Sequence, residues 1–223
     1  SAFYLTLLLV LAGFTGAMMV SIVVDGMLGQ TPIEYGPFYQ LRERLAISRW
    51  ATLAAKWTIM FLVAVVLSTL FIAVGAMVGT SIPNGFVLWM LSVLGIFAVG
   101  VSASAMMAVF GNPGLLFNLL FFVVFGLPSS GGTLPLEASP RLFEWIAAIE
   151  PMHVIYLGVR AVLYFDADLS AGLGRSIIQC FIGLLVGVLL GLLGTKFYDR
   201  KGWHRYPGGM TLPPKLDKIV NAG

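Results

Sequence analysis

Charged residues are scarce in this chain of 223 residues, because Asp, Glu, Lys and Arg together make up only 10%. Soluble domains carry about a quarter charged residues, so the composition excludes a soluble globular enzyme. Cysteine occurs once, as Cys180, which excludes a disulfide-linked scaffold. His153 and His204 are the two histidines, and they lie too far apart to suggest a metal site. We therefore expect neither a metal nor a cofactor.

Strong positive charge is also missing, since the formal net charge is +3. The basic residues fall between and after the apolar tracts, where a membrane protein carries them. This distribution argues against nucleic acid as a partner.

Long apolar runs are what the sequence does have: 59% of the residues are hydrophobic and the mean hydropathy is +0.95. Residues 2–24, 57–136 and 176–195 contain no charged residue. About 18 or more apolar residues without charge are typical of a membrane-spanning helix. A β-barrel would alternate apolar and polar residues, and these tracts do not. The sequence predicts an all-α protein that crosses a membrane several times.

Two turn signals divide the longest tract. Residues 81–85 (Ser-Ile-Pro-Asn-Gly) and 111–114 (Gly-Asn-Pro-Gly) are both typical of loops. The division predicts five spans, close to residues 2–24, 57–79, 86–110, 115–130 and 176–197. We expect a membrane domain over residues 1–198 and a tail over residues 199–223.

The distribution of Lys and Arg predicts the orientation. The loop over residues 25–56 contains four basic residues and the chain after Thr195 contains six, against three in residues 137–175. Basic residues collect on the cytoplasmic side. We therefore expect Ser1 outside and the C-terminus inside, in a bacterial plasma membrane.

The first span would then enter from outside, and it has no basic segment before it as a signal peptide does. We expect an N-terminal span and an external domain to precede Ser1. The five spans would be the last five of a protein with six or more spans.

The first cytoplasmic loop contains an amphipathic pattern after Gly36 and Pro37. Apolar and basic residues alternate at helical spacing, which predicts a helix over residues 38–56. Such a helix can lie at the lipid headgroups or dock on a partner protein. The candidate contact residues for a partner, such as a separate ATPase, are Phe38, Leu41, Arg42, Arg44, Leu45 and Arg49.

The segment before the last span is irregular, because turn-forming glycines and prolines interrupt it and its helical stretches are too short to span a membrane. It predicts two short external helices, over residues 140–149 and 152–165, that re-enter the outer half of the membrane. The glycine-rich turn before them and the proline between them suggest an external gate. Its candidate residues are Gly131, Gly132, Pro135, Pro151 and His153.

Glycines four residues apart mark two spans as packing surfaces. Small residues allow helices to approach closely in lipid. The candidate packing residues are Gly75, Gly79, Gly183, Gly187 and Gly191.

Catalytic motifs are absent from the sequence. Ser130 and His153 could form a nucleophile–base pair, but Pro128 stands where an intramembrane serine protease motif would have glycine. No lysine follows a glycine, so there is no phosphate-binding loop of its own. We expect a protein that is not an enzyme.

The run Ser-Ser-Gly-Gly-Thr-Leu-Pro-Leu over residues 129–136 is followed by Pro140, Phe143, Pro151-Met152 and Tyr156-x-x-x-Arg160. This pattern resembles the C-terminal membrane domain of the phage infection protein family, within the type-2 ABC exporter permease superfamily. The resemblance extends over most of the chain, although only residues 128–165 carry its motifs.

The resemblance implies a permease-like subunit that exports lipids, polymers or hydrophobic small molecules. It implies membrane lipids as surroundings, a homodimer or other membrane subunits, and a separate ATPase as partners. Members of this branch often lack an obvious ATPase, which leaves an alternative open: a non-transporting accessory or scaffold subunit of a larger membrane complex.

Overall fold

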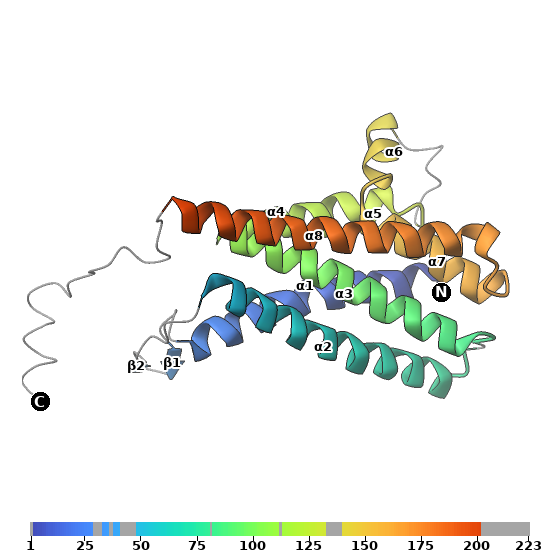
Figure 1. Cartoon of the computed structure of the whole chain (residues 1–223). Helices are drawn as coiled ribbons and strands as arrows, with labels where there is room; N and C mark the ends of the chain where they lie inside the picture. Colours follow the sequence, from blue (N-terminus) through green and yellow to red (C-terminus); the bar gives the residue numbers. More distant parts are fainter. Residues whose placement is uncertain are drawn as a thin grey trace, which may run out of the picture.

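A computed structural model shows a bundle of long helices (Figure 1). It describes residues 2–28, 33–35, 38–40, 48–80, 82–111, 113–132 and 140–201. The described elements are α1 (Ala2–Met27), β1 (Ile33–Tyr35), β2 (Phe38–Gln40), α2 (Arg49–Met77), α3 (Gly85–Phe110), α4 (Pro113–Leu119), the π-helical segment η1 (Leu120–Phe125), α5 (Gly126–Ser129), α6 (Arg141–Ala147), α7 (Pro151–Tyr164), the π-helical turn η3 (Leu169–Leu173) and α8 (Gly174–Arg200).

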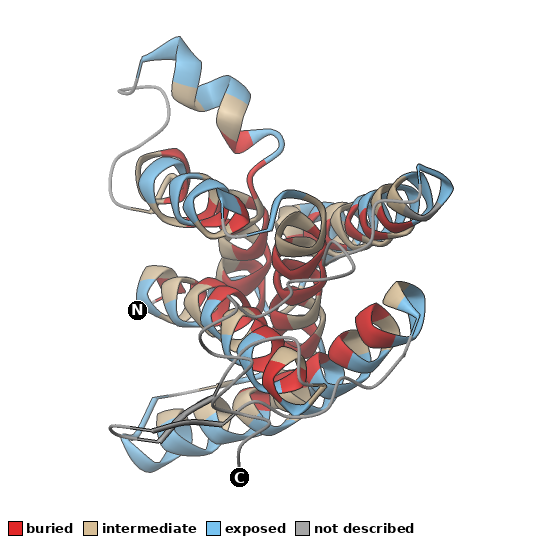
Figure 2. Ribbon diagram, turned by 90° about the vertical axis from the view of Figure 1, so that its left-hand side faces the viewer, coloured by how far each residue is buried: buried red, intermediate tan, exposed pale blue. Residues whose placement is uncertain are grey.

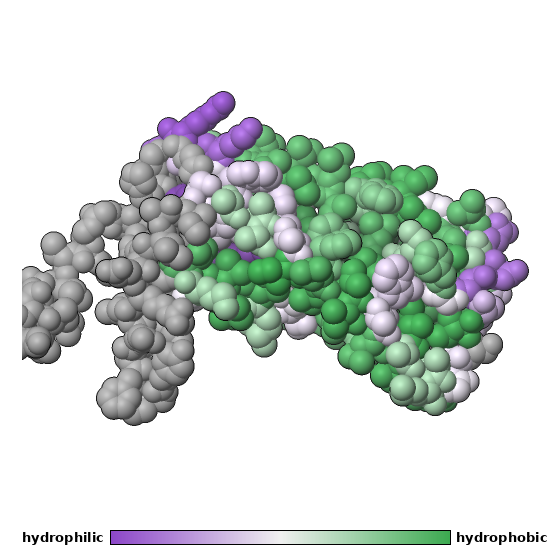
Figure 3. Space-filling model, turned by 60° about the horizontal axis from the view of Figure 1, so that its bottom comes forward, coloured by the Kyte–Doolittle hydropathy of each residue, from purple (hydrophilic) through white to green (hydrophobic). Residues whose placement is uncertain are grey.

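Four helices are long and apolar enough to cross a membrane, and the bent pair α6–α7 would provide a fifth. The run Pro113–Ser129 is a shorter apolar helix. Apolar side chains cover the face shown in Figure 3, with hydrophilic groups towards its two ends. The prediction of a helical, multi-pass membrane protein is confirmed at this level.

Helix α3 lies at the centre of the bundle. It packs against α8, α1 and α2, and more than half of its most apolar stretch is buried, whereas α2 and α8 are largely exposed (Figure 2). Small residues over 98–105 let its neighbours approach closely. Exposed apolar faces on α2 and α8 are what a surrounding bilayer requires.

The helix predicted over residues 38–56 is wrong in its first part. Residues 38–40 form strand β2, which pairs antiparallel with β1 so that Tyr35 lies opposite Phe38. Aromatic and β-branched residues favour strands, and the short hydrophobic pattern did not distinguish a helix from a strand. Residues 41–47 lie outside the described part of the chain.

The helix that contains the span predicted over residues 57–79 begins at Arg49. The Ser48 hydroxyl caps the helix by accepting a hydrogen bond from the Ala51 N–H at 3.2 Å. No helix-breaking residue follows, so α2 continues without a break into the span. We call the end of the bundle that carries β1, β2 and Arg49 the hairpin end.

Helices α6 and α7 lie where two short helices were predicted, over residues 140–149 and 152–165, with ends that differ by one or two residues. Pro140 has an extended backbone and precedes α6, whereas Pro151 is the first residue of α7. Helices α6 and α7 are bent by 73° at the break between them. Proline suits the first helical turn because its missing N–H has no partner there. Because of this bend, helix α6 stands away from the bundle while α7 packs within it (Figure 1).

Candidate functional site

The bundle contains a cavity of about 480 Å³, which we call the lateral cavity. Its floor is formed by α3 and α7, and its sides by α4 with η1 and by α8. The end-on view in Figure 2 shows helices flanking the buried centre of the bundle. On the α8 side, Ile182 and Val186 are more than half exposed, so the cavity is bordered by a surface that would face lipid.

Hydrogen bonds from small polar residues hold the walls of the lateral cavity. The Ser102 hydroxyl donates to the Gly183 carbonyl of α8 at 3.3 Å. The Asn118 amide nitrogen of α4 donates to the Ala103 carbonyl at 3.0 Å. Both contacts join a neighbouring helix to adjacent residues of α3, which fixes the two walls relative to the floor.

Two carboxamide oxygens in the cavity walls lack a partner. Asn118 Oδ1 and Gln179 Oε1 are buried and accept no hydrogen bond from the described residues. Neither Asn118 nor Gln179 was among the site residues predicted from the sequence. Their sequence signal is an amide side chain within an uncharged apolar tract. Polar side chains in spans tend to hydrogen-bond across helices or to bind a ligand.

At the break between α6 and α7, outside the long spanning helices, a carboxyl group is fully buried. Glu150 caps α7, with Oε2 accepting from the His153 N–H at 3.0 Å. Oε1 has no partner among the described residues. Burial raises the pKa of Glu150 to about 7, although backbone N–H groups of α7 partly oppose this. Sequence reasoning did not select Glu150.

The predicted external gate is partly assembled around this carboxyl. The ring of His153 hydrogen-bonds through Nδ1 to the Ser130 carbonyl at 2.9 Å. Gly131 has φ +71°, and a side chain on Gly132 would overlap Phe3 of α1. Pro151 borders the lateral cavity. Gly131 and Gly132 follow α5, and Pro151 and His153 lie in the first turn of α7, whereas Pro135 lies outside the described residues.

The hydroxyl of Ser130 does not hydrogen-bond to the ring of His153, as a nucleophile–base pair would require. Ser130 Oγ donates to the Leu127 carbonyl at 2.8 Å. Burial lowers the pKa of His153, as do the charges of Arg175 and Arg160, while the bond to Ser130 opposes them. The imidazole therefore holds the turn rather than activating Ser130 in this arrangement.

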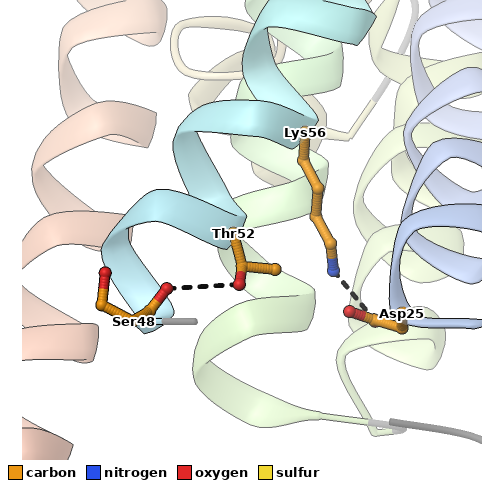
Figure 4. Close-up of polar contacts among 4 residues, drawn as sticks. All are labelled: Asp25, Ser48, Thr52 and Lys56. Carbon is orange, nitrogen blue, oxygen red and sulfur yellow. Dashed lines mark hydrogen bonds and ion pairs between the residues drawn. The ribbon is translucent and has the colours of Figure 1, made fainter. Parts of the chain in front are cut away.

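An ion pair closes the space between α1 and α2 near the hairpin end. Lys56 Nζ lies 2.9 Å from Asp25 Oδ2, and their side chains are 5% and 21% exposed (Figure 4). One turn earlier, the Thr52 hydroxyl donates to the Ser48 carbonyl at 3.2 Å. The sequence predicted Lys56 as the last residue of a cytoplasmic helix, whereas it lies within the continuous α2 and points at α1.

The predicted partner-contact residues are only partly described. Arg49 lies at the start of α2, with its guanidinium 5.5 Å from the centre of the Tyr198 ring of α8. It also borders a second cavity, of about 320 Å³, together with Lys56. Phe38 lies in strand β2. Leu41, Arg42, Arg44 and Leu45 lie outside the described residues.

The candidate packing glycines behave differently from one another. A Cβ on Gly187 would lie 3.0 Å from Ser102 Cα, and one on Gly191 would lie 2.9 Å from Leu53, so both permit close helix contact. A Cβ on Gly183 would meet nothing within 4 Å, because this residue borders the lateral cavity.

Gly75 and Gly79, also predicted to pack against other helices, have no neighbouring helix within the described bundle. Gly79 follows the end of α2 with φ +83°, which glycine adopts readily. A Cβ on Gly75 would meet only Ile82, at an ordinary 3.7 Å. Neither glycine joins two of the described helices, so their packing role stays a prediction that would need a second subunit.

The difference in packing between Gly187 and Gly183 predicts that the same substitution destabilises the protein far more at Gly187 than at Gly183. Gly187→Leu is expected to lower the free energy of unfolding by about 1–3 kcal/mol, because its side chain would overlap the backbone of α3. Gly183→Leu should lower the melting temperature much less, because a Cβ there meets nothing within 4 Å and the residue borders the lateral cavity. Melting of the purified variants in detergent measures both. Equal losses would contradict this assignment of the α3–α8 contact.

One protein family matches residues 1–187, and it is described as a protein of unknown function (DUF3533). No curated protein and no solved structure matches the chain significantly.

Proposed function

We propose that this chain, which belongs to the DUF3533 family, is a permease-like membrane subunit that exports lipids, polymers or hydrophobic small molecules. The observation that carries the proposal is the lateral cavity. It combines apolar walls, a border on lipid-facing helix surface and a volume of about 480 Å³. Ligand sites are mostly apolar cavities of this size, with few polar groups.

The interrupted helices beside the cavity support the same proposal. Helix α4 continues through the π-helical η1, and α6 is bent away from α7. Transporters commonly build their sites from broken helices near the middle of the membrane. In the proposed mechanism, cargo enters between α4–η1 and α8, and Gly131, Gly132, Pro151 and His153 control its exit on the outer side.

The topology in this proposal has five spans, with Pro113–Ser129 as the fourth and α6–α7 as a re-entrant pair. The hairpin end would then face the cytoplasm of a bacterium and present Arg49 and β2 to an ATPase. A homodimer would place two such bundles side by side. The excess of Lys and Arg towards the hairpin end supports this orientation.

Filling the cavity tests the function. In inside-out vesicles from cells producing the full-length protein, the wild type should move a fluorescent single-chain lipid between leaflets. Gly183→Leu should slow this movement at least tenfold, because its side chain occupies the cavity while disturbing the bundle little. Protection of the fluorophore from a membrane-impermeant quencher measures the rate.

Gly183→Ala is the matched control and should retain wild-type movement, since it adds only one methyl group. Wild-type transport by Gly183→Leu would contradict a cargo path through this cavity. Lipid movement that is absent from the wild type, together with co-purification of a large non-ATPase assembly, would favour an accessory subunit instead.

A further inference from the structure

We infer that the lateral cavity binds a neutral, single-chain amphiphile whose headgroup carries at least two hydrogen-bond donors, as a monoacylglycerol does. The inference deepens the proposed function, since it takes the cavity as the cargo site. It requires binding only, so it can hold where transport fails.

The absence of charge around the cavity selects a neutral headgroup. None of the described residues that line it is Asp, Glu, Lys, Arg or His. A charged headgroup would therefore be buried without a partner, which is strongly unfavourable. Phosphate, carboxylate and ammonium headgroups do not suit these walls.

The unpartnered amide oxygens select hydrogen-bond donors. Asn118 is fully buried, and its Nδ2 is used by the Ala103 carbonyl, which leaves Oδ1 as an acceptor without a donor. Gln179 Oε1, in the wall formed by α8, is also buried and accepts no hydrogen bond from the described residues. A buried acceptor without a partner is costly, so a ligand that donates to both oxygens would be favoured over one that donates to neither.

The two amides lie at neighbouring levels of the bundle. Asn118 is bonded to Ala103, next to Ser102, which is bonded to Gly183. Gln179 lies four residues before Gly183, or about 6 Å along the axis of α8. A small headgroup with two separated hydroxyl groups can span this interval.

The rest of the cavity suits one hydrocarbon chain. Its remaining walls are mainly aliphatic and aromatic, and include Val99, Phe121, Phe122, Val186 and Leu190. The volume of about 480 Å³ lies in the lower half of the usual range for ligand sites, which favours one chain over two. The exposed Ile182 and Val186 mark the side from which a membrane amphiphile would enter.

Photocrosslinking tests this assignment in the full-length protein in lipid nanodiscs. The probe is a 1-monooleoylglycerol with a diazirine in its acyl chain, and the competitors are unlabelled 1-monooleoylglycerol, methyl oleate and oleate. We expect crosslinks on α3, α4, η1 or α8, and a competition constant for monooleoylglycerol at least tenfold lower than for the other two. Methyl oleate lacks donors, and oleate carries a charge.

Substitutions in the cavity distinguish recognition of the headgroup from binding of the hydrocarbon chain. Gln179→Leu should weaken monooleoylglycerol about fivefold, the value of one neutral hydrogen bond, and leave methyl oleate unchanged. Asn118→Leu should do the same, although it also loses the bond to Ala103. Gly183→Leu should abolish specific crosslinking to these helices.

Equal competition by monooleoylglycerol and methyl oleate, or stronger competition by oleate, would overturn the headgroup assignment. Specific crosslinking retained in Gly183→Leu would overturn the site. Specific binding without lipid movement in vesicles would leave this inference standing and remove the export function. Lipid movement that depends on Gly183 but shows no preference for the hydroxyl-bearing headgroup would support the export function and overturn the headgroup assignment.

Discussion

A Lys56→Met variant is expected to lose about 3–5 kcal/mol of its free energy of unfolding, because it leaves the Asp25 carboxylate without its ammonium partner in a largely buried site. Methionine keeps the length of the side chain, so the loss reports charge rather than volume. Unfolding of the purified protein in mixed micelles measures the change.

Two controls distinguish pairing from a general effect of losing a lysine. Lys196→Met, at an exposed position of α8, should change the free energy by less than about 0.5 kcal/mol. The double variant Lys56→Met with Asp25→Leu should recover most of the stability, since an apolar pair can replace a buried ion pair. A double variant as unstable as the single one would show that the cost arises elsewhere.

Stability should also fall as the pH rises from about 4.5 to about 7, because Glu150 must ionise in a buried site. A water-exposed glutamate loses its proton near pH 4.5, whereas the buried carboxyl keeps it until about pH 7. The folded protein thus binds more protons across this interval, and rising pH disfavours it by about 3 kcal/mol. Above pH 7 the contribution levels off.

Glu150→Gln should abolish this fall and make the protein more stable than the wild type at pH 8. The neighbouring His153 acts in the opposite sense: its lowered pKa costs stability only as the pH falls below about 6.5. Glu144→Gln, at an exposed position of α6, is the matched control and should keep the wild-type pH profile. Melting temperatures between pH 4 and pH 8 that are the same for both variants would contradict the role of Glu150.

The helical architecture was accessible from the sequence because its signals are local. Charge-free tracts mark the long helices, and the turns at 81–85 and 111–114 separate α2 from α3 and α3 from α4. Apolar composition and glycine or proline act within a few residues, so no knowledge of neighbours was needed.

The start of α2 and the site depend instead on contacts between distant residues. Lys56 marks the edge of a span by charge, yet Asp25, 31 residues away, allows it to lie inside a helix. Glu150 preceding Pro151 indicates a helix start, but its burial depends on Gly126, where a Cβ would come within 2.8 Å of Glu150 Oε1. The lateral cavity likewise follows from how four helices meet, which no single segment encodes.

The π-helical segment Leu120–Phe125 also affects how this family can vary in length. A π-helical turn accommodates more residues than an α-helical turn. Removing one residue from this segment would restore an ordinary α-helix while keeping Asn118 and Ser129, on either side of it, directed at their present neighbours. Relatives can therefore gain or lose a residue here without rebuilding the bundle, and a one-residue gap in an alignment at this place would mark a change in the wall of the cavity rather than a change of fold.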